Sequence, residues 1–394
     1  FDKSVASTAS FGGTGQVSST ELQMVKTAGV LQFGNTLASD ISLKGMDRTS
    51  YSESLVLVKA TGSISFDTGA TIIAKALDAR AKTDITLSAD LTVLAGYAYF
   101  LADSDSDASG SFIVAASKTF TVSSPGVSVR IMAADISLDS TCVLALSSSS
   151  LSLVSTASRG FHLGGASAGG TFVELDATEA ARITTTGTWT VQSPAITVLS
   201  IVAADTHSAP IELNARSSGG HIDFAAASTF YSLNATAAAG ISVAADIGTT
   251  TGQLSLDGNY DMVGDDTTSL FPSVALSAGS NLLLHTRASG YVAVSGSGSW
   301  SAAGDVLLGS GVRVSGSGST LAIGADSDGS GSGSLTFAST SNITVVSSTY
   351  SQISFKYSDV QWSSGFTLSA SNADVIFDKS VASTASFGGT GQVS

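Results

Sequence analysis

The chain has 394 residues, a net charge of −14 and only 12% charged residues, about half the share of a typical globular protein. The chain is instead rich in Ser, Thr and Ala and contains 41 Gly. Hydrophobic residues still make up 43% of the sequence, which excludes a disordered linker. Lysine and arginine form no dense cluster, so we expect no nucleic-acid partner. The single cysteine, Cys142, excludes an internal disulfide framework, and its apolar neighbours predict a buried side chain.

The first predicted elements are short. Residues 21–28 fit a short helical turn, and Ile64-Ser65-Phe66 is an apolar triplet of the kind that makes a strand with one buried face. Residues 71–82 alternate between apolar and polar side chains, so we predict a strand there. The apolar run 91–102 is shorter than the ~18 residues that a membrane span needs. No membrane-spanning segment is therefore expected.

Similar triplets follow along the rest of the chain, separated by Gly, Ser, Asn and Asp. They lie at residues 112–114, 151–153, 222–224, 241–243, 254–256, 312–314, 321–323, 353–355 and 366–368. Strands this short, with small residues at the corners, suit a coil that turns three times per rung and stacks equivalent residues on successive rungs. We therefore predict an all-β chain that forms a parallel β-helix (β-solenoid), continuous along its length.

An aspartate precedes many of the predicted strands. We expect its carboxylate to accept a backbone N–H within its own corner, as in an Asx-turn. These aspartates are Asp40, Asp84, Asp90, Asp135, Asp246, Asp305 and Asp374. Residues 102–122 also resemble residues 325–345 at an offset of 223. Internal repetition of this kind favours a solenoid.

The strongest repeat joins the two ends of the sequence. Residues 1–18 read FDKSVASTASFGGTGQVS, and residues 377–394 read the same. We interpret residues 1–376 as one tandem repeat unit of β-solenoid and 377–394 as the start of the next; an engineered duplication is the alternative. At roughly 20 to 30 residues a rung and ~4.8 Å between strands, one period makes about 13 to 19 rungs, on the order of 60–90 Å of fibre.

The stacked triplets, the Gly/Ser/Asp corners and the scarcity of Pro and Cys resemble repetitive surface fibres. Filamentous haemagglutinins and autotransporter passengers are the best-known group, and protist flagellar hairs are similar. The resemblance implies an extracellular protein of the cell surface with a role in display or adhesion. It implies no particular ligand.

Residues for catalysis or metal binding are few, so we expect no enzyme, no cofactor and no metal. Asp265-Asp266 is the only adjacent acidic pair and reads as a turn. Asp103, Asp105 and Asp107 alternate as in a calcium loop but lack its later Gly and Glu, which predicts a solvated acidic corner. The histidines lack metal-ligand spacing; they are His162, His207, His221 and His285.

Three functions stay open. The first hypothesis is a structural fibre of axially stacked repeats whose partner is itself, with lateral bundling as an option. The second is an adhesin that binds glycan or protein through an outer face, for which Trp189, Trp300 and Trp362 are candidates if exposed and core residues if not. The third is a polysaccharide-acting enzyme. Asn234 and Asn342 match the N-glycosylation acceptor and would carry glycan in a secreted eukaryotic glycoprotein.

Overall fold

The structure is a computed structural model. It describes residues 9–11, 24–25, 27–35, 38–49, 54–67, 71–166, 172–262, 268–271, 273–286, 290–316, 318–338, 342–346, 351–363 and 366–379. Strands make up 55% of it and helices 2%, so the chain is all-β, as predicted. It forms two compact units, Phe1–Ser193 with Ala204–Ala209, and Pro194–Ala203 with Pro210–Ser394.

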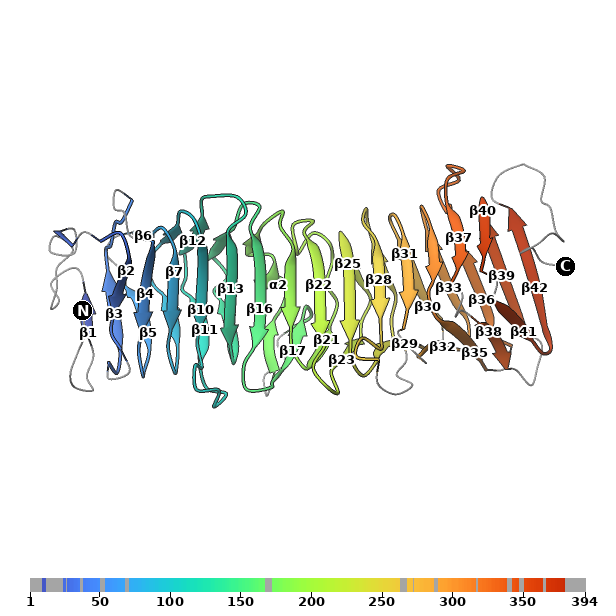
Figure 1. The fold of residues 1–394 in the computed structure, drawn as a ribbon, viewed down its shortest axis with the longest axis horizontal. Coiled ribbons are helices and arrows are strands. Elements are labelled where there is room, and N and C mark those ends of the chain that lie inside the picture. Colours follow the sequence, from blue (N-terminus) through green and yellow to red (C-terminus); the bar gives the residue numbers. More distant parts are fainter. Residues whose placement is uncertain are drawn as a thin grey trace. The chain divides into compact units, whose positions relative to one another are not determined.

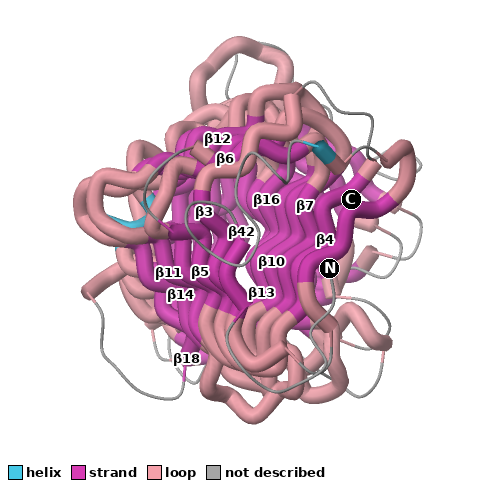
Figure 2. The backbone as a smooth tube through the Cα atoms, turned by 90° about the vertical axis from the view of Figure 1, so that its left-hand side faces the viewer, coloured by secondary structure: helices cyan, strands magenta, loops and turns pink. Residues whose placement is uncertain are grey.

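The first unit is a coil with three parallel sheets as its walls. Seen end-on, strands of successive rungs overlie one another in each wall (Figure 2). The first wall holds β1 (Ala9–Phe11), β3 (Ile41–Lys44), β5 (Ile64–Asp67), β8 (Ile85–Leu87), β11 (Ser111–Val114) and β14 (Asp135–Leu138). The second wall holds β2 (Val30–Phe33), β4 (Leu55–Lys59), β7 (Leu77–Arg80), β10 (Tyr97–Leu101), β13 (Ser128–Ala133), β16 (Ser150–Ser155) and β20 (Trp189–Gln192). The third wall holds β6 (Ile72–Ala74), β9 (Leu91–Val93), β12 (Thr119–Val122), β15 (Val143–Ala145) and β19 (Ile183–Thr184).

The chain visits the three walls in turn, one strand each per rung. Val56, Leu77 and Ala98 lie in register on successive rungs, so each of these rungs adds 21 residues (77 − 56 = 21). The next rung, from Ala98 to Val129, adds 31 (129 − 98 = 31). Residues 71–82, predicted as one strand, form β6 and β7 on two walls, because the chain turns a corner between them.

A further strand pair interrupts the regular order of the first unit. β17 (Gly160–Leu163) and β18 (Phe172–Leu175) pair in parallel and are followed by the four-residue helix α2 (Ala177–Ala180). Asp176 caps this helix: its carboxylate accepts the N–H of Glu179, and the Glu179 carboxylate accepts the N–H of Asp176 in return.

The second unit has the same three-walled design (Figure 1). One wall holds β22 (Pro210–Ala215), β25 (Ser232–Ala237), β28 (Leu254–Asp257), β31 (Leu282–His285), β34 (Val306–Leu308), β37 (Ser334–Phe337) and β40 (Asp359–Trp362). Another holds β21 (Ala195–Val198), β23 (His221–Phe224), β26 (Ile241–Val243), β29 (Thr268–Leu270), β32 (Tyr291–Ser295), β35 (Gly311–Ser315), β38 (Asn342–Val346) and β41 (Thr367–Ala370). The third holds β24 (Ser228–Phe230), β27 (Ile247–Thr249), β30 (Val274–Ala278), β33 (Gly298–Ala302), β36 (Thr320–Gly324), β39 (Ser351–Tyr357) and β42 (Ala373–Lys379). Both units are parallel β-solenoids, as predicted.

The core of each unit is a stack of inward-facing apolar side chains. In the rung formed by β10, β11 and β12, each wall contributes one buried phenylalanine: Phe100, Phe112 and Phe120. The ring centroids of Phe100 and Phe112 lie 5.0 Å apart, and those of Phe100 and Phe120 lie 5.4 Å apart, edge to face. Three short strands thus close one layer of core, and the next rung covers it.

Aspartates at the corners tie one rung to the next. The carboxylate of Asp84 accepts the N–H of Ser111 at 2.9 Å, and the carboxylate of Asp305 accepts the N–H of Ser334 at 2.8 Å. Asp40, Asp90 and Asp246 accept in the same way from Ser63, Thr119 and Ala275. The predicted Asx-turn within the aspartate's own corner is therefore wrong for Asp84, Asp90, Asp246 and Asp305, because each donor lies at or next to the start of the equivalent strand one rung later.

The inter-rung bond of Asp84 gives a first prediction. Replacing Asp84 by Ala leaves the N–H of Ser111 without its acceptor and should lower the free energy of unfolding by about 1–2 kcal/mol. Asp84→Asn is the matched control, since Asn281 already plays this part by accepting the N–H of Asp305 at 3.0 Å. Denaturant unfolding measures both variants. Equal losses in Ala and Asn would contradict a role for the side-chain acceptor.

The terminal repeat lies almost entirely outside the described residues. Of residues 1–18 and 377–394, the structure describes Ala9–Phe11 in β1 and residues 377–379 at the end of β42. The repeat boundary at residue 376 therefore stays a prediction, and so does the helical turn at 21–28, of which only part is described.

Candidate functional site

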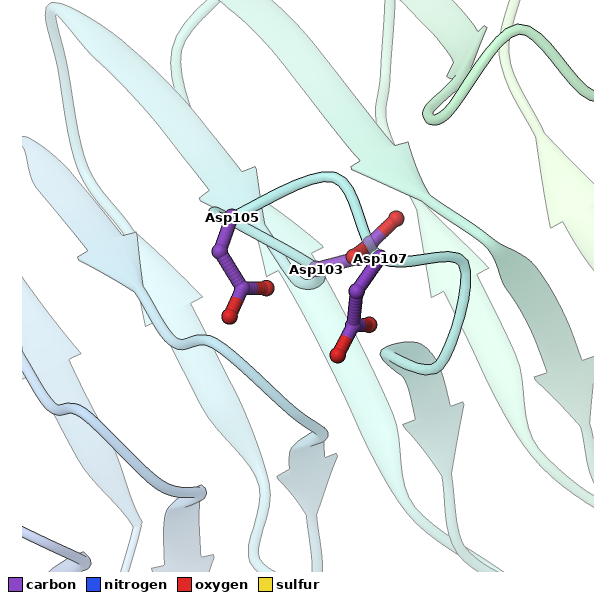
Figure 3. Close-up of side chains that lie close together, drawn as sticks. All are labelled: Asp103, Asp105 and Asp107. Carbon is purple, nitrogen blue, oxygen red and sulfur yellow. The ribbon is translucent and has the colours of Figure 1, made fainter.

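The loop between β10 and β11 holds the one group of three potential metal ligands found among the described residues. The carboxylate oxygens of Asp103, Asp105 and Asp107 lie within 4.8 Å of one another (Figure 3). Asp103 is fully buried, whereas Asp105 and Asp107 are exposed. The cluster therefore combines one inner carboxylate with two at the surface.

Each carboxylate of this cluster has a partner in the protein. Asp103 accepts the N–H of Ala108 at 3.2 Å and the hydroxyl of Thr156 at 2.5 Å. The side-chain and backbone hydrogen bonds from Ser109 lower the pKa of Asp107, and the ammonium of Lys82 lies 3.6 Å from Asp105. These contacts tie the loop to itself and to residues of other rungs.

The loop at residues 325–333 in the second unit repeats this design. Asp326 is fully buried and accepts the N–H of Gly331 at 2.9 Å, as Asp103 accepts that of Ala108. The φ angles of Asp103 and Asp326 are 63° and 60°, a left-handed conformation that Asp tolerates better than most residues. The offset of 223 seen in the sequence therefore marks one loop structure used twice.

A glycine completes each copy of the loop. A Cβ on Gly110 would lie 2.1 Å from the backbone nitrogen of Asp103, and one on Gly333 would lie 2.3 Å from that of Asp326. The chain passes so close to the buried aspartate that any larger residue would push the loop away.

This close approach gives a second prediction. Gly110→Ala should lower the free energy of unfolding by about 2–3 kcal/mol, because the new methyl group meets backbone atoms that cannot move aside. Gly126 is the matched control: it has φ 75°, and no atom lies within 4 Å of the place that a methyl group would take there, so Gly126→Ala should lose only about 1 kcal/mol. Denaturant unfolding compares the two, and equal losses would contradict the steric account.

The four histidines lie at separate places. His162 is half-buried on β17, stacks on Phe172 at 3.8 Å and lies 3.9 Å from the carboxylate of Glu174; burial lowers its pKa. His221 and His285 each approach one carboxylate, that of Asp223 at 3.6 Å and that of Asp257 at 3.7 Å. His207 lies 3.0 Å from the carbonyl oxygen of Ala181. None of them shares a site with another histidine.

Two half-buried carboxyl groups, Asp135 and Glu179, lie where β14, β18 and α2 meet. The Glu179 carboxylate accepts the N–H groups of Leu138 at 2.9 Å and Asp176 at 3.1 Å. Burial nevertheless raises the pKa of Glu179 and that of Asp135. Their charges therefore oppose folding, whereas their hydrogen bonds favour it.

The raised pKa of Glu179 gives a third prediction. A carboxyl group with a higher pKa in the folded state holds its proton to higher pH there, so its contribution to stability falls as pH rises from about 4 through the raised value. In Glu179→Gln, the free energy of unfolding should therefore decrease less between pH 4 and pH 7 than it does in the unmodified chain. The control is His162→Asn: its lowered pKa predicts stability lost as pH falls below about 6.5. An unchanged pH profile in Glu179→Gln would contradict the assignment.

The tryptophans do not form an exposed series. Trp189 and Trp300 are fully buried, so the interpretation of these two as core residues is confirmed and their candidacy for ligand binding is wrong. Trp362 is half-exposed on β40 and stacks on Phe337, with ring centroids 4.7 Å apart and planes 4° apart. An outer binding face would need other aromatic side chains.

The remaining candidates divide between described and undescribed residues. Asn234 lies half-buried within β25, and Asn342 is exposed at the start of β38, where its side-chain oxygen accepts the hydroxyl of Thr367 at 2.8 Å. Both stay candidate glycosylation sites. Asp265 and Asp266 lie outside the described residues. Cys142 is buried, as predicted, and burial raises the pKa of its thiol to about 11.

Hollows in the surface of the second unit are small and open. One of about 180 Å³ is lined by His221, Asp223 and the start of β26. Another of about 320 Å³ lies beside β27 and is lined by small side chains with Asp246 and Val202. Ser242 and Ser269 also line the first hollow, where the His221 ring lies 3.6 Å from the carboxylate of Asp223.

Within the described residues, no helix has the length and apolar character required to cross a bilayer. Comparison of the chain with protein-family models, with curated protein sequences and with solved structures found no match in any of the three.

Proposed function

We propose that the chain is a segment of an extracellular structural fibre, a shaft built from tandem long β-solenoid repeats. The observation that supports this proposal is the stacking itself: one strand of each rung pairs in parallel register with the strand one rung later. Such a coil can be extended by adding rungs without any change in its core. Its function is then mechanical, because it spans distance at the cell surface.

The rung formed by β40, β41 and β42 supports axial self-association. Inward-facing side chains of β39, such as Ile353 and Phe355, are fully buried, whereas their neighbours Val375 and Phe377 on β42 are half-exposed. Trp362 lies 5.8 Å from Phe377, measured between ring centroids. Elsewhere in the described strands each such apolar layer is covered by the next rung, and in the proposed fibre the next repeat covers this one.

A surface adhesin is the second candidate, because one outer wall of the first unit carries basic and aromatic side chains, whereas an outward column of the adjacent wall carries Ser42, Ser65 and Thr86. A polysaccharide-acting enzyme has no supporting observation among the described residues.

Electron microscopy of the native material tests the shaft. At the 21 to 31 residues per rung seen here, a 376-residue period holds about 12 to 18 rungs, which predicts an axial repeat of about 60–85 Å and a layer line at ~4.8 Å. Thin filaments with both spacings are the expected result. Discrete particles without an axial repeat would contradict the proposal.

A further inference from the structure

The outer surface of the wall formed by β4, β7, β10 and β13 differs from its neighbours. Its outward-facing residues include Lys59, Arg80, Tyr97, Tyr99 and Arg130, which together are called the basic–aromatic platform below. On the adjacent wall, the outward column in register on β3, β5 and β8 consists of Ser42, Ser65 and Thr86. A solenoid tolerates small hydroxyl residues at such positions, so large side chains in register need a separate explanation.

The register brings the residues of the platform together. Lys59 pairs with Arg80 on the next rung, and Tyr99 pairs with Asp78 on one side and Arg130 on the other. Neighbouring strands lie ~4.8 Å apart, so these side chains form one continuous surface. Asp78 shows this, because it faces outward and is still only 5% exposed.

The platform has an excess of positive charge. Arg80 holds Asp78 with two hydrogen bonds of 2.8 and 2.7 Å, yet 45% of its side chain stays exposed. Lys59 and Arg130 form no ion pair with any described residue. Three cations thus face one carboxylate, in a chain whose net charge is −14. Like charges on facing strand positions oppose pairing, and a bound anion would remove that repulsion.

The aromatic part of the platform is held in place. The Arg80 guanidinium carbon lies 5.3 Å from the centre of the Tyr99 ring, and the Tyr99 hydroxyl donates to the sulfur of Met132 at 3.2 Å. Tyr97, two residues earlier on the same outward side of β10, is 39% exposed. The two rings and the cations beside them offer apolar faces and charge on one surface.

We propose that the basic–aromatic platform binds an anionic polysaccharide. Apolar faces of the sugar rings would pack on Tyr97 and Tyr99, and carboxylate or sulfate groups would pair with Lys59, Arg130 and the exposed edge of Arg80. A linear polymer with regularly spaced anions matches cations spaced by rungs. Three cations are few for nucleic acid, whose binding rests on many phosphate contacts. The site is independent of the shaft proposal.

Binding of the whole chain to three immobilised polymers tests the proposal: polygalacturonate, which carries carboxylates, dextran sulfate, and uncharged dextran. Arg130→Glu and Lys59→Glu should each weaken binding to a charged polymer at least tenfold, and binding should weaken as salt rises. Arg80 is left unchanged because it pairs with the buried Asp78. The matched control is Arg313→Glu, since Arg313 lies 3.8 Å over the ring of Tyr291 on another wall and should not affect binding.

The two charged polymers distinguish carboxylate from sulfate as the preferred group, and a preference for either supports the proposal. Equal affinity for uncharged dextran, an equal loss in Arg313→Glu, or no loss in the two platform variants would overturn it. Sedimentation velocity shows whether the platform instead contacts a second copy of the chain. Self-association that disappears in Arg130→Glu would also overturn the polysaccharide proposal. If the variants and the unmodified chain unfold at the same denaturant midpoint, misfolding is excluded. Electron microscopy of the fibre tests the shaft proposal separately.

Discussion

The backbone hydrogen bonds between successive rungs are the constraint on which the rest of this structure depends. A strand of three to five residues buries too little surface to persist alone, so each strand needs a partner on the rung before and the rung after it. Parallel register fixes the side chains as well: once Val56, Leu77 and Ala98 are aligned, every second residue faces the core. The three phenylalanines Phe100, Phe112 and Phe120 then fill one layer from three walls.

The corners must satisfy backbone donors that the ladders leave over. Side chains on one rung accept hydrogen bonds from these backbone donors on the next rung. Along the first wall, aspartate and serine alternate at the acceptor position, so negative charges do not lie on adjacent rungs. Asp40 accepts from Ser63, and Asp84 accepts from Ser111, so a serine lies between successive aspartates. Asp135 follows Ser111 in register. Charged acceptors on neighbouring rungs would repel one another across ~4.8 Å.

Much of the fold could be predicted from the sequence, because alternation within a triplet such as 64–66 needs no knowledge of distant residues. What could not be predicted depends on register. The donor to Asp84 begins a strand 27 residues later, so the local Asx-turn was the simpler expectation. The basic–aromatic platform was missed for the same reason: Arg80 and Arg130 become neighbours of Tyr99, and Lys59 becomes a neighbour of Arg80, only when rungs of 21 and 31 residues are stacked. The burial of Trp189 and Trp300 likewise depends on which face of the strand points toward the core. The neighbouring residues in the sequence do not decide this.

Disulfide trapping tests the register most directly. Ser65 and Thr86 face outward in register on adjacent rungs, where Cα atoms ~4.8 Å apart fall within the range that a disulfide spans. Ser42 lies in the same column one rung further from Thr86. On oxidation of the folded chain, the Ser65→Cys, Thr86→Cys pair should crosslink quantitatively, and the Ser42→Cys, Thr86→Cys pair should not; Cys142 is buried and does not compete. Crosslinking of the second pair in preference to the first would contradict the stacked register from which the whole account is built.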